Sequence, residues 1–319
     1  MIRPRNLCRR AALLLALAAA VAVSAADFDY RLQPRKLADG AYAFIGARED
    51  FDTVNGGNIV NTGFLVGSDG IVVIDSGPSK RYGEQMRAAI ALVSSRPVAL
   101  TILTHHHPDH MLGNQAFAGT PIGALAPTVA GIAADGNGFA ENLFRLSGDW
   151  MKGTEVVVPN RTLQPGRQQV AGRWLRLIAL AGHTHADLAV YDEKSGILFA
   201  GDIVFNDRAP TTPHASIDAW LKALAELEAI TREPGFVALL PGHGEPARDA
   251  APIRQTREWL LWLRATLNKA AADGLDMTEV LALPLPARWA SMPLAAIEYR
   301  RSVGHLYPAI EAETLAHAH

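Results

Sequence analysis

A continuous apolar run at residues 98–104 leads directly into the sequence HHHPDH at residues 105–110. An apolar run of this kind predicts a strand that is buried on both faces. The turn after it is expected to let His105 and His107 face one way and Asp109 and His110 another. That arrangement suits two metal ions a few ångströms apart. The alternative is a polar surface turn, which four ligand-type residues within six positions after a buried strand disfavour.

Three later predicted strands also end in a turn that carries a metal-ligand side chain. His183 follows a strand ending at residue 180, Asp202 follows a strand at 197–200, and His243 follows one at 236–240. Glycine stands beside each ligand and permits a tight turn. The ligands can therefore converge on one edge of the sheets. Nitrogen and carboxylate ligands favour zinc, and iron and manganese are compatible alternatives.

The predicted elements form two similar halves, each with strands followed by helices. In the first half the strands are expected at residues 41–45, 62–66, 71–74 and 98–104, and the helices at 80–92, 111–117, 127–134 and 140–150. In the second half the strands are expected at 174–180, 188–191, 197–200 and 236–240, with a helix at 216–230 and helices from there to the end. No linker rich in Pro, Gly or Ser separates the halves. The pattern predicts two packed sheets with helices outside, folded as one domain.

The first 25 residues have the three parts of a secretory signal peptide. Four arginines precede an apolar run at residues 11–23, and small residues at 23–26 offer cleavage sites. We therefore expect a periplasmic or secreted protein, with Sec export favoured over the twin-arginine route. Cleavage would remove the single cysteine, Cys8, so the mature chain would have no thiolate ligand. No later stretch is long and apolar enough to span a membrane.

Composition excludes two broad classes of protein. The 319 residues include 30 basic and 32 acidic side chains, which provide no basic footprint for nucleic acid. Since 49% of the residues are hydrophobic, the chain can bury a large core and is not disordered. The expected ligand is therefore a small-molecule substrate.

Five motifs in order resemble those of the metallo-β-lactamase fold hydrolases. They are IDSG with Asp75, HHHPDH at 105–110, GHT at 182–184, GD at 201–202 and GHG at 242–244. The resemblance implies an α/β (α+β) fold, the four-layer αββα sandwich. It also implies that residues 26–319 form a single domain, with a helical extension from about residue 250.

The same resemblance implies two Zn²⁺ ions per chain, bound by a glyoxalase II-like ligand set. One zinc would be held by His105, His107 and His183, and the other by Asp109, His110 and His243. Asp202 would bridge the two ions, and Asp75 would orient the ligand loop through hydrogen bonds.

Further segments are similar to the quinoprotein relay system zinc metallohydrolases. These segments are NGGNIVNTG from Asn55, RYGEQ at 81–85, YRRS at 299–302 and HLYP at 305–308. The similarity implies a link to a pathway of PQQ-dependent dehydrogenases, and such a dehydrogenase as a partner.

The expected reaction is hydrolysis of a small ester, thioester or lactone. Two dications would lower the pKa of a bridging water and so generate the hydroxide nucleophile. Asp109 would hold or transfer the proton. The alternatives are a β-lactamase-type amide hydrolase, a mononuclear-iron persulfide dioxygenase, and a metal-dependent accessory protein of a quinoprotein that turns nothing over.

Three residues are candidates for the rim of the pocket or for substrate contact. Asn114 would either brace the metal loop or touch substrate, and His214 would rim the pocket. Asn58 lies in a glycine-rich segment that predicts a hairpin turn or, alternatively, a mobile flap over the metals.

Overall fold

A computed structural model describes residues 28–317 of the chain. The predicted signal peptide at residues 1–25 lies outside the described residues. Residues 28–31 belong to a separate short unit without helix or strand, and the described chain from Leu32 onward forms one compact unit. Among the described residues, no helix has the length and apolar character needed to cross a membrane.

The first sheet of the described chain has seven strands that lie in chain order. They are β1 (Arg35–Ala38), β2 (Ala41–Phe44), β3 (Thr62–Val66), β4 (Ile71–Ile74), β5 (Val98–Ile102), β6 (Ile122–Ala124) and β7 (Arg161–Thr162). Strands β1 to β4 pair antiparallel, whereas β4 to β7 pair parallel. The predicted buried strand is therefore β5, which ends at Ile102, two residues earlier than expected.

The second sheet has five strands in the order β12-β11-β10-β9-β8. They are β8 (Gly166–Val170), β9 (Arg173–Leu180), β10 (Asp187–Asp192), β11 (Ile197–Phe199) and β12 (Ala238–Leu240). Only the β11–β12 pair is parallel. The sequence did not predict β8, whose segment GRQQV is polar and forms an exposed to half-buried edge.

The two sheets pack face to face and enclose an apolar core. Leu65 and Ile102 from the first sheet meet Leu177, Val190 and Phe199 from the second, and all five are at most 2% exposed. Burial of each such side chain stabilises the fold by roughly 1.5–3 kcal/mol. This core holds the strand ends of both sheets at a fixed separation.

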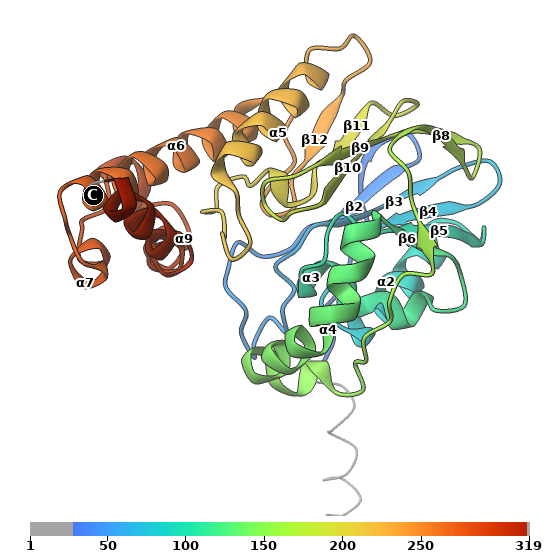
Figure 1. Cartoon of the computed structure of the whole chain (residues 1–319). Helices are drawn as coiled ribbons and strands as arrows, with labels where there is room; N and C mark the ends of the chain where they lie inside the picture. Colours follow the sequence, from blue (N-terminus) through green and yellow to red (C-terminus); the bar gives the residue numbers. More distant parts are fainter. Residues whose placement is uncertain (1–27, 318–319) are drawn as a thin grey trace, which may run out of the picture. The chain divides into compact units, whose positions relative to one another are not determined.

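Helices cover the outer face of each sheet (Figure 1). Beside the first sheet lie α2 (Lys80–Val93), α3 (Pro108–Met111) and α4 (Ala126–Ser147). The helices beside the second sheet and after it are α5 (Ile217–Ile230), α6 (Ala251–Ala272), α7 (Met277–Leu281), α8 (Ala287–Ala290) and α9 (Ala295–His317). The four-layer αββα sandwich predicted from the sequence is thereby confirmed.

The helices differ in detail from those predicted. The two short helices expected at residues 127–134 and 140–150 form the single 22-residue helix α4, which tolerates three internal glycines, except that residues 148–150 belong to the following 3-10 helix η2 (Gly148–Met151). The helix expected at 111–117 begins earlier, as α3, and continues as the 3-10 helix η1 (Leu112–Phe117). From residue 251 onward the described chain consists of four helices joined by short loops, and Trp259, Tyr299 and Val303 join the core on the outer face of the second sheet.

Candidate metal centre

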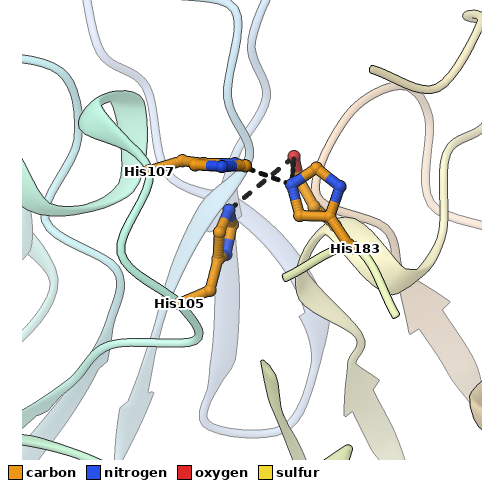
Figure 2. A group of neighbouring side chains, drawn as sticks. His105, His107 and His183 are labelled. Atoms are coloured by element: carbon orange, nitrogen blue, oxygen red, sulfur yellow. Dashed lines mark hydrogen bonds and ion pairs between the residues drawn. The ribbon is translucent and has the colours of Figure 1, made fainter. Parts of the chain in front are cut away.

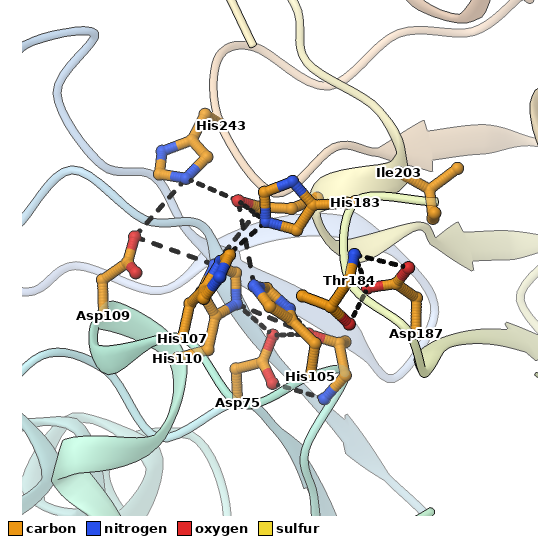
Figure 3. Close-up of polar contacts among 12 residues, drawn as sticks. Asp75, His105, His107, Asp109, His110, His183, Thr184, Asp187, Ile203 and His243 are labelled. Atoms are coloured by element: carbon orange, nitrogen blue, oxygen red, sulfur yellow. Dashed lines mark hydrogen bonds and ion pairs between the residues drawn. The ribbon is translucent and has the colours of Figure 1, made fainter. Parts of the chain in front are cut away.

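The first group of candidate ligands lies where β5 passes into α3. His105 and His107 stand on the intervening turn, and Pro108 is the first residue of α3. Proline suits this position because it lacks the N–H that a first helical residue would leave unpaired. The helix start places Asp109 and His110 in the first turn of α3, beside the two preceding histidines (Figure 3).

The remaining candidates follow three strands of the second sheet. His183 stands after β9, Asp202 lies in the 3-10 helix η3 (Gly201–Ile203) after β11, and His243 follows β12. The backbone of Gly242 approaches Asp202 so closely that a Cβ there would lie 1.8 Å from Asp202 Oδ1. Glycine is therefore required beside His243. The turns bring ligands from both sheets to one edge of the sandwich.

The first cluster consists of His105, His107 and His183 (Figure 2). His183 Nε2 lies 2.7 Å from His107 Nδ1. Asp202 Oδ2 lies 3.3 Å from His183 Nε2 and 3.9 Å from His105 Nε2. All four side chains are buried, and each offers one ligand atom to a common centre.

The second cluster consists of Asp109, His110 and His243. Asp109 Oδ2 lies 3.4 Å from His243 Nε2 and 3.7 Å from His110 Nε2. Asp202 reaches this cluster as well, because its Oδ1 lies 3.1 Å from His110 Nε2 and its Oδ2 lies 3.2 Å from His243 Nε2. The Asp202 carboxylate therefore lies between the two clusters and touches both.

These clusters fit metal ions. Zinc binds nitrogen and oxygen ligands at 2.0–2.2 Å in a tetrahedron, so neighbouring ligand atoms lie about 3.3 Å apart. Most of the separations above fall close to that spacing. His105 Nε2 is buried without a hydrogen-bond partner among the described residues. Such atoms are costly to bury unless a ligand completes them.

The far side of two candidate ligands is held by a neighbour. His105 Nδ1 lies 3.0 Å from Thr104 Oγ1, and His243 Nδ1 lies 2.7 Å from the carbonyl oxygen of Ile59. Because a carbonyl only accepts, Nδ1 of His243 carries the proton and Nε2 is free to bind a metal. The outer contacts thus select the nitrogen that faces the centre.

Asp75 performs the same task for His110. Its Oδ2 lies 2.8 Å from His110 Nδ1, and the same carboxylate accepts hydrogen bonds from Thr104 N and Oγ1, each at 2.8 Å. Asp75 has φ +57°, a left-handed conformation that non-glycine residues seldom adopt. Its three contacts hold this conformation and tie the end of β4 to the ligand loop.

Burial keeps the histidines of the first cluster neutral. Burial lowers the pKa of His183 to about 3. It also lowers the pKa of His105 and His107 well below the ordinary value, with neighbouring histidines adding to the effect. Neutral imidazole is the form that binds metal.

In the second cluster and at Asp202, neighbouring charges favour the charged form of the side chain. Burial acts to lower the pKa of His110, but Asp202, Asp109 and Asp75 raise it well above the ordinary value. Burial acts to raise the pKa of Asp202, but His243 and His110 hold it well below the ordinary value. The carboxylate is therefore anionic and is available to bind cations.

A third histidine group lies beside the first cluster. His107 Nε2 is 2.9 Å from His214 Nδ1, and the ring centroid of His106 is 5.1 Å from those of both residues. If Nδ1 of His107 binds metal, its Nε2 carries the proton and donates to His214. His214, predicted at the pocket rim, is exposed and lines the cavity described below.

A cavity of about 210 Å³ opens onto the metal centre. Its lining includes the ligands His107, Asp109, Asp202 and His243. Apolar side chains in the lining are Phe51, Ile59 and Phe139, and charged ones are Asp50, Arg208, Glu298 and Arg301. The sequence singled out the segment around Arg301 only through the family resemblance, and gave no role to Arg208 or Glu298, which belong to no metal-ligand motif.

The other two rim candidates do not line this cavity. Asn114 is fully buried; its Oδ1 accepts a hydrogen bond from Ser76 Oγ at 2.9 Å, and its Nδ2 donates to the Val157 carbonyl at 2.9 Å. The structure thus gives Asn114 a bracing position. Asn58 lies in a turn, where its carbonyl accepts a hydrogen bond from Ala47 N at 2.9 Å.

Comparison with known families gives one match, to the metallo-beta-lactamase superfamily over residues 55–264. Among curated proteins, the acyl-coenzyme A thioesterase MBLAC2 of Gallus gallus is 26% identical in an alignment 218 residues long, and the match covers 59% of this chain and 73% of that protein. The hydroxyacylglutathione hydrolase of Rhodobacter capsulatus is 35% identical over 101 residues, or 32% of each chain.

Solved structures share the fold at low sequence identity. A metallo-beta-lactamase from Pontibacter korlensis superposes with a TM-score of 0.57 and 23% identity, covering 72% of this chain and 99% of that one. The matched family segment contains every candidate ligand, whereas α8 and α9 lie beyond it.

Proposed function

The chain belongs to the metallo-beta-lactamase superfamily, and we propose that this metallo-hydrolase is a dinuclear zinc enzyme that cleaves small thioesters, with esters and lactones as related substrates. The observation that carries the proposal is the position of Asp202. Its carboxylate lies 3.1–3.9 Å from Nε2 of four histidines that belong to two clusters. A carboxylate shared in this way suits two cations better than one.

Seven side chains would hold the ions. His105, His107 and His183 would bind one zinc; Asp109, His110 and His243 would bind the other; and Asp202 would bind both. When bound, the zinc ions supply Lewis-acid polarisation of the acyl oxygen and a water of lowered pKa. A sulfur ligand is absent from this set, since the one cysteine of the chain is Cys8.

The protein's own groups bind the substrate and receive the proton. Asp109 both lines the cavity and faces the centre, with Oδ2 3.4 Å from His243 Nε2, so the carboxylate oxygen that does not bind the ion is available to hold the proton released by the attacking water. Phe51, Ile59 and Phe139 give the cavity an apolar part that takes an acyl chain and excludes bulk water.

Two similarities favour thioesters within the hydrolase class. The names of both curated relatives above describe enzymes that act on thioesters, an acyl-coenzyme A and an acylglutathione. A thiolate is also a good leaving group, so the reaction needs no dedicated general acid. The lining of the cavity contains no histidine–serine or histidine–cysteine pair that would supply a side-chain nucleophile. Lactones and esters share the same acyl chemistry.

We also propose that the enzyme acts in the periplasm or outside the cell, in a pathway that contains a PQQ-dependent dehydrogenase. The support for export is the signal-like pattern at residues 1–25. The support for the pathway is the similarity of residues 55–63, 81–85 and 299–308 to the quinoprotein-associated group.

The test starts from the full chain, purified after expression with its own N-terminus. Metal analysis should give two zinc ions per chain. Turnover is then measured on S-acyl glutathiones, acyl-coenzyme A esters, lactones, phosphodiesters and β-lactams. We expect the highest kcat/KM on a thioester.

The matched variants are Asp202→Ala and Asp69→Ala, because Asp69 is an exposed aspartate in the turn between β3 and β4. The first should lose metal and turnover, and the second should keep both. One iron ion with oxygen uptake would overturn the proposal in favour of an oxygenase. Full metallation without turnover of any substrate, together with capture of a dehydrogenase, would overturn it in favour of an accessory protein.

A further inference from the structure

Two charged side chains in the wall of the metal-centre cavity have unused hydrogen-bonding atoms. Arg208 comes from the segment after η3, and Glu298 comes from α9. Both line the cavity that the candidate ligands His107, Asp109 and Asp202 also line. They are 3% and 0% exposed, so bulk water does not satisfy them.

Arg208 is a buried cation that forms no close ion pair, although its charge acts on Glu298, whose pKa burial raises and Arg208 lowers. No carboxylate within residues 28–317 lies within 4.0 Å of its guanidinium, and its Nε has no hydrogen-bond partner there. Its one hydrogen bond in this part of the chain is long, 3.4 Å from a terminal nitrogen to the Ala209 carbonyl. The guanidinium carbon lies 5.7 Å from the centroid of the Phe205 ring. An arginine in these surroundings is costly to bury unless a ligand supplies an acceptor.

Glu298 provides the complementary atom. Its Oε1 accepts a hydrogen bond from Arg301 at 2.8 Å, while its buried Oε2 has no hydrogen-bond partner in the described chain. Both terminal nitrogens of Arg301 donate to Asp50, at 2.6 and 3.2 Å, and none of its nitrogens donates to Glu298 Oε2. One acceptor position on the cavity wall is therefore open.

The charges of this wall balance. Arg208 and Arg301 carry two positive charges, and Asp50 and Glu298 can carry two negative ones. Arg208 lies close enough to Glu298 to lower its pKa against the larger effect of burial, so an anionic group near Arg208 would also face Glu298, and a cationic group near Glu298 would also face Arg208. A neutral group that accepts from Arg208 and donates to Glu298 satisfies both open atoms without adding charge.

We propose that Arg208 and Glu298 form a subsite for a neutral hydroxyl or carboxamide on the part of the substrate remote from the scissile bond. The proposal rests on the proposed function and narrows its substrate class to acyl compounds that carry such a group. Arg208 lies inside the matched family segment, residues 55–264, whereas Glu298 lies on α9 outside it, so the subsite depends on both the family segment and the C-terminal helix.

The first experiment measures binding and needs no turnover. Unreactive thioether analogues of an acyl glutathione, ending in methyl, hydroxyl, carboxamide or carboxylate, are titrated calorimetrically into the zinc-loaded chain. We expect the hydroxyl and carboxamide ligands to bind at least about 10-fold more tightly than the methyl ligand, because the site's open polar atoms are then paired. The carboxylate ligand should gain no such advantage.

Two variants test the assignment to these residues. Glu298→Gln and Arg208→Met should each remove most of the 10-fold preference, with circular dichroism checking that they fold. Glu313→Gln is the matched control, because Glu313 is an exposed glutamate on the same helix α9. It should keep the preference.

Equal affinity for the methyl and hydroxyl ligands in the parent chain would overturn the subsite, and so would tightest binding of the carboxylate ligand. Failure of this proposal is distinguishable from failure of the proposed function. Hydrolysis of thioesters without any polar preference sinks the subsite alone. A polar binding preference without turnover of any thioester supports the subsite and sinks the proposed function.

Discussion

Two buried charged clusters lie at opposite ends of the same strands, and they are built differently. Asp192 pairs with Ile197, the first residue of β11, whereas Asp202 follows the last. At the first end, Arg173 donates from Nε to Asp192 Oδ1 at 3.0 Å and from a terminal nitrogen to Oδ2. Ser195 N donates to the same carboxylate at 2.9 Å. At the other end, Asp202 is surrounded by imidazoles, and Nε2 of His105 beside it has no hydrogen-bond partner in the described chain.

The difference teaches how to separate structural from functional burial of charge. Arg173 also donates to the Val66 carbonyl at 3.1 Å, so its charge is fully paired while it links β9 to the first sheet. The cluster around Asp202 has atoms that the protein leaves open. A buried polar atom without a hydrogen-bond partner is costly unless a ligand binds to it. The Arg173–Asp192 cluster is expected to act on stability, and the metal centre around Asp202 on chemistry.

The largest expected effect comes from the Asp202 end. His105→Ala or Asp202→Ala should lower kcat/KM at least ~10³-fold, because metal-assisted charge stabilisation is worth several kcal/mol and 1.4 kcal/mol is tenfold in rate. The metal-free chain should nevertheless fold as the parent does. Kinetics, metal analysis and thermal unfolding in chelator check this. Full activity with bound metal would contradict the assignment.

Removal of the metal should affect the centre around Asp202 and leave the Arg173–Asp192 cluster unchanged. Dialysis against a chelator should abolish turnover, and added zinc should restore it. If the chain is saturated at about 1,000 times the dissociation constant, metal removal should also cost about 4 kcal/mol of unfolding free energy. Denaturant unfolding with and without chelator measures this. The Arg173→Met chain should show the same difference; a change there would mean that the two ends are not independent.

Disruption of the Arg173–Asp192 cluster should lower stability and leave turnover unchanged. Arg173→Met leaves the fully buried Asp192 uncompensated, so unfolding free energy should fall by about 3–5 kcal/mol. Turnover per folded molecule should stay within about 2-fold of the parent value. The double variant Arg173→Met with Asp192→Leu should recover most of the loss, because no buried charge then remains unpaired. A large fall in turnover per folded molecule would contradict the purely structural role of the Arg173–Asp192 cluster.

The sequence predicts the metal centre better than it predicts the cavity around it. His105, His107, Asp109 and His110 lie within six consecutive positions, so local spacing brings them together. The later ligands follow strands whose carboxyl ends must meet at one sheet edge once the sheets pack. Each signal can be recognised within a few consecutive residues, so an error of one or two residues in a predicted strand boundary does not change it.

The cavity wall could not be predicted in this way. Arg208 and Glu298 are 90 positions apart and line one cavity through the packing of α9, which no local pattern encodes. A charged residue is also read as surface by default, although both of these are buried. The strand β8 was missed for a similar reason, since polar edge strands have weak sequence signals.

The smallest expected effect concerns Asp75, the carboxylate behind His110 in the metal centre. Asp75→Asn should weaken zinc binding by about 10–100-fold, because the charged partner of His110 Nδ1 becomes neutral. Asparagine tolerates the φ of +57°, so the change removes charge without adding backbone strain. Competition with a chromophoric chelator measures the affinity directly. Asp207→Asn is the matched control, since Asp207 has φ +50° but is exposed and pairs at 3.4 Å with Arg48. An equal loss in both variants would show that backbone conformation, and not the carboxylate behind His110, sets the metal affinity.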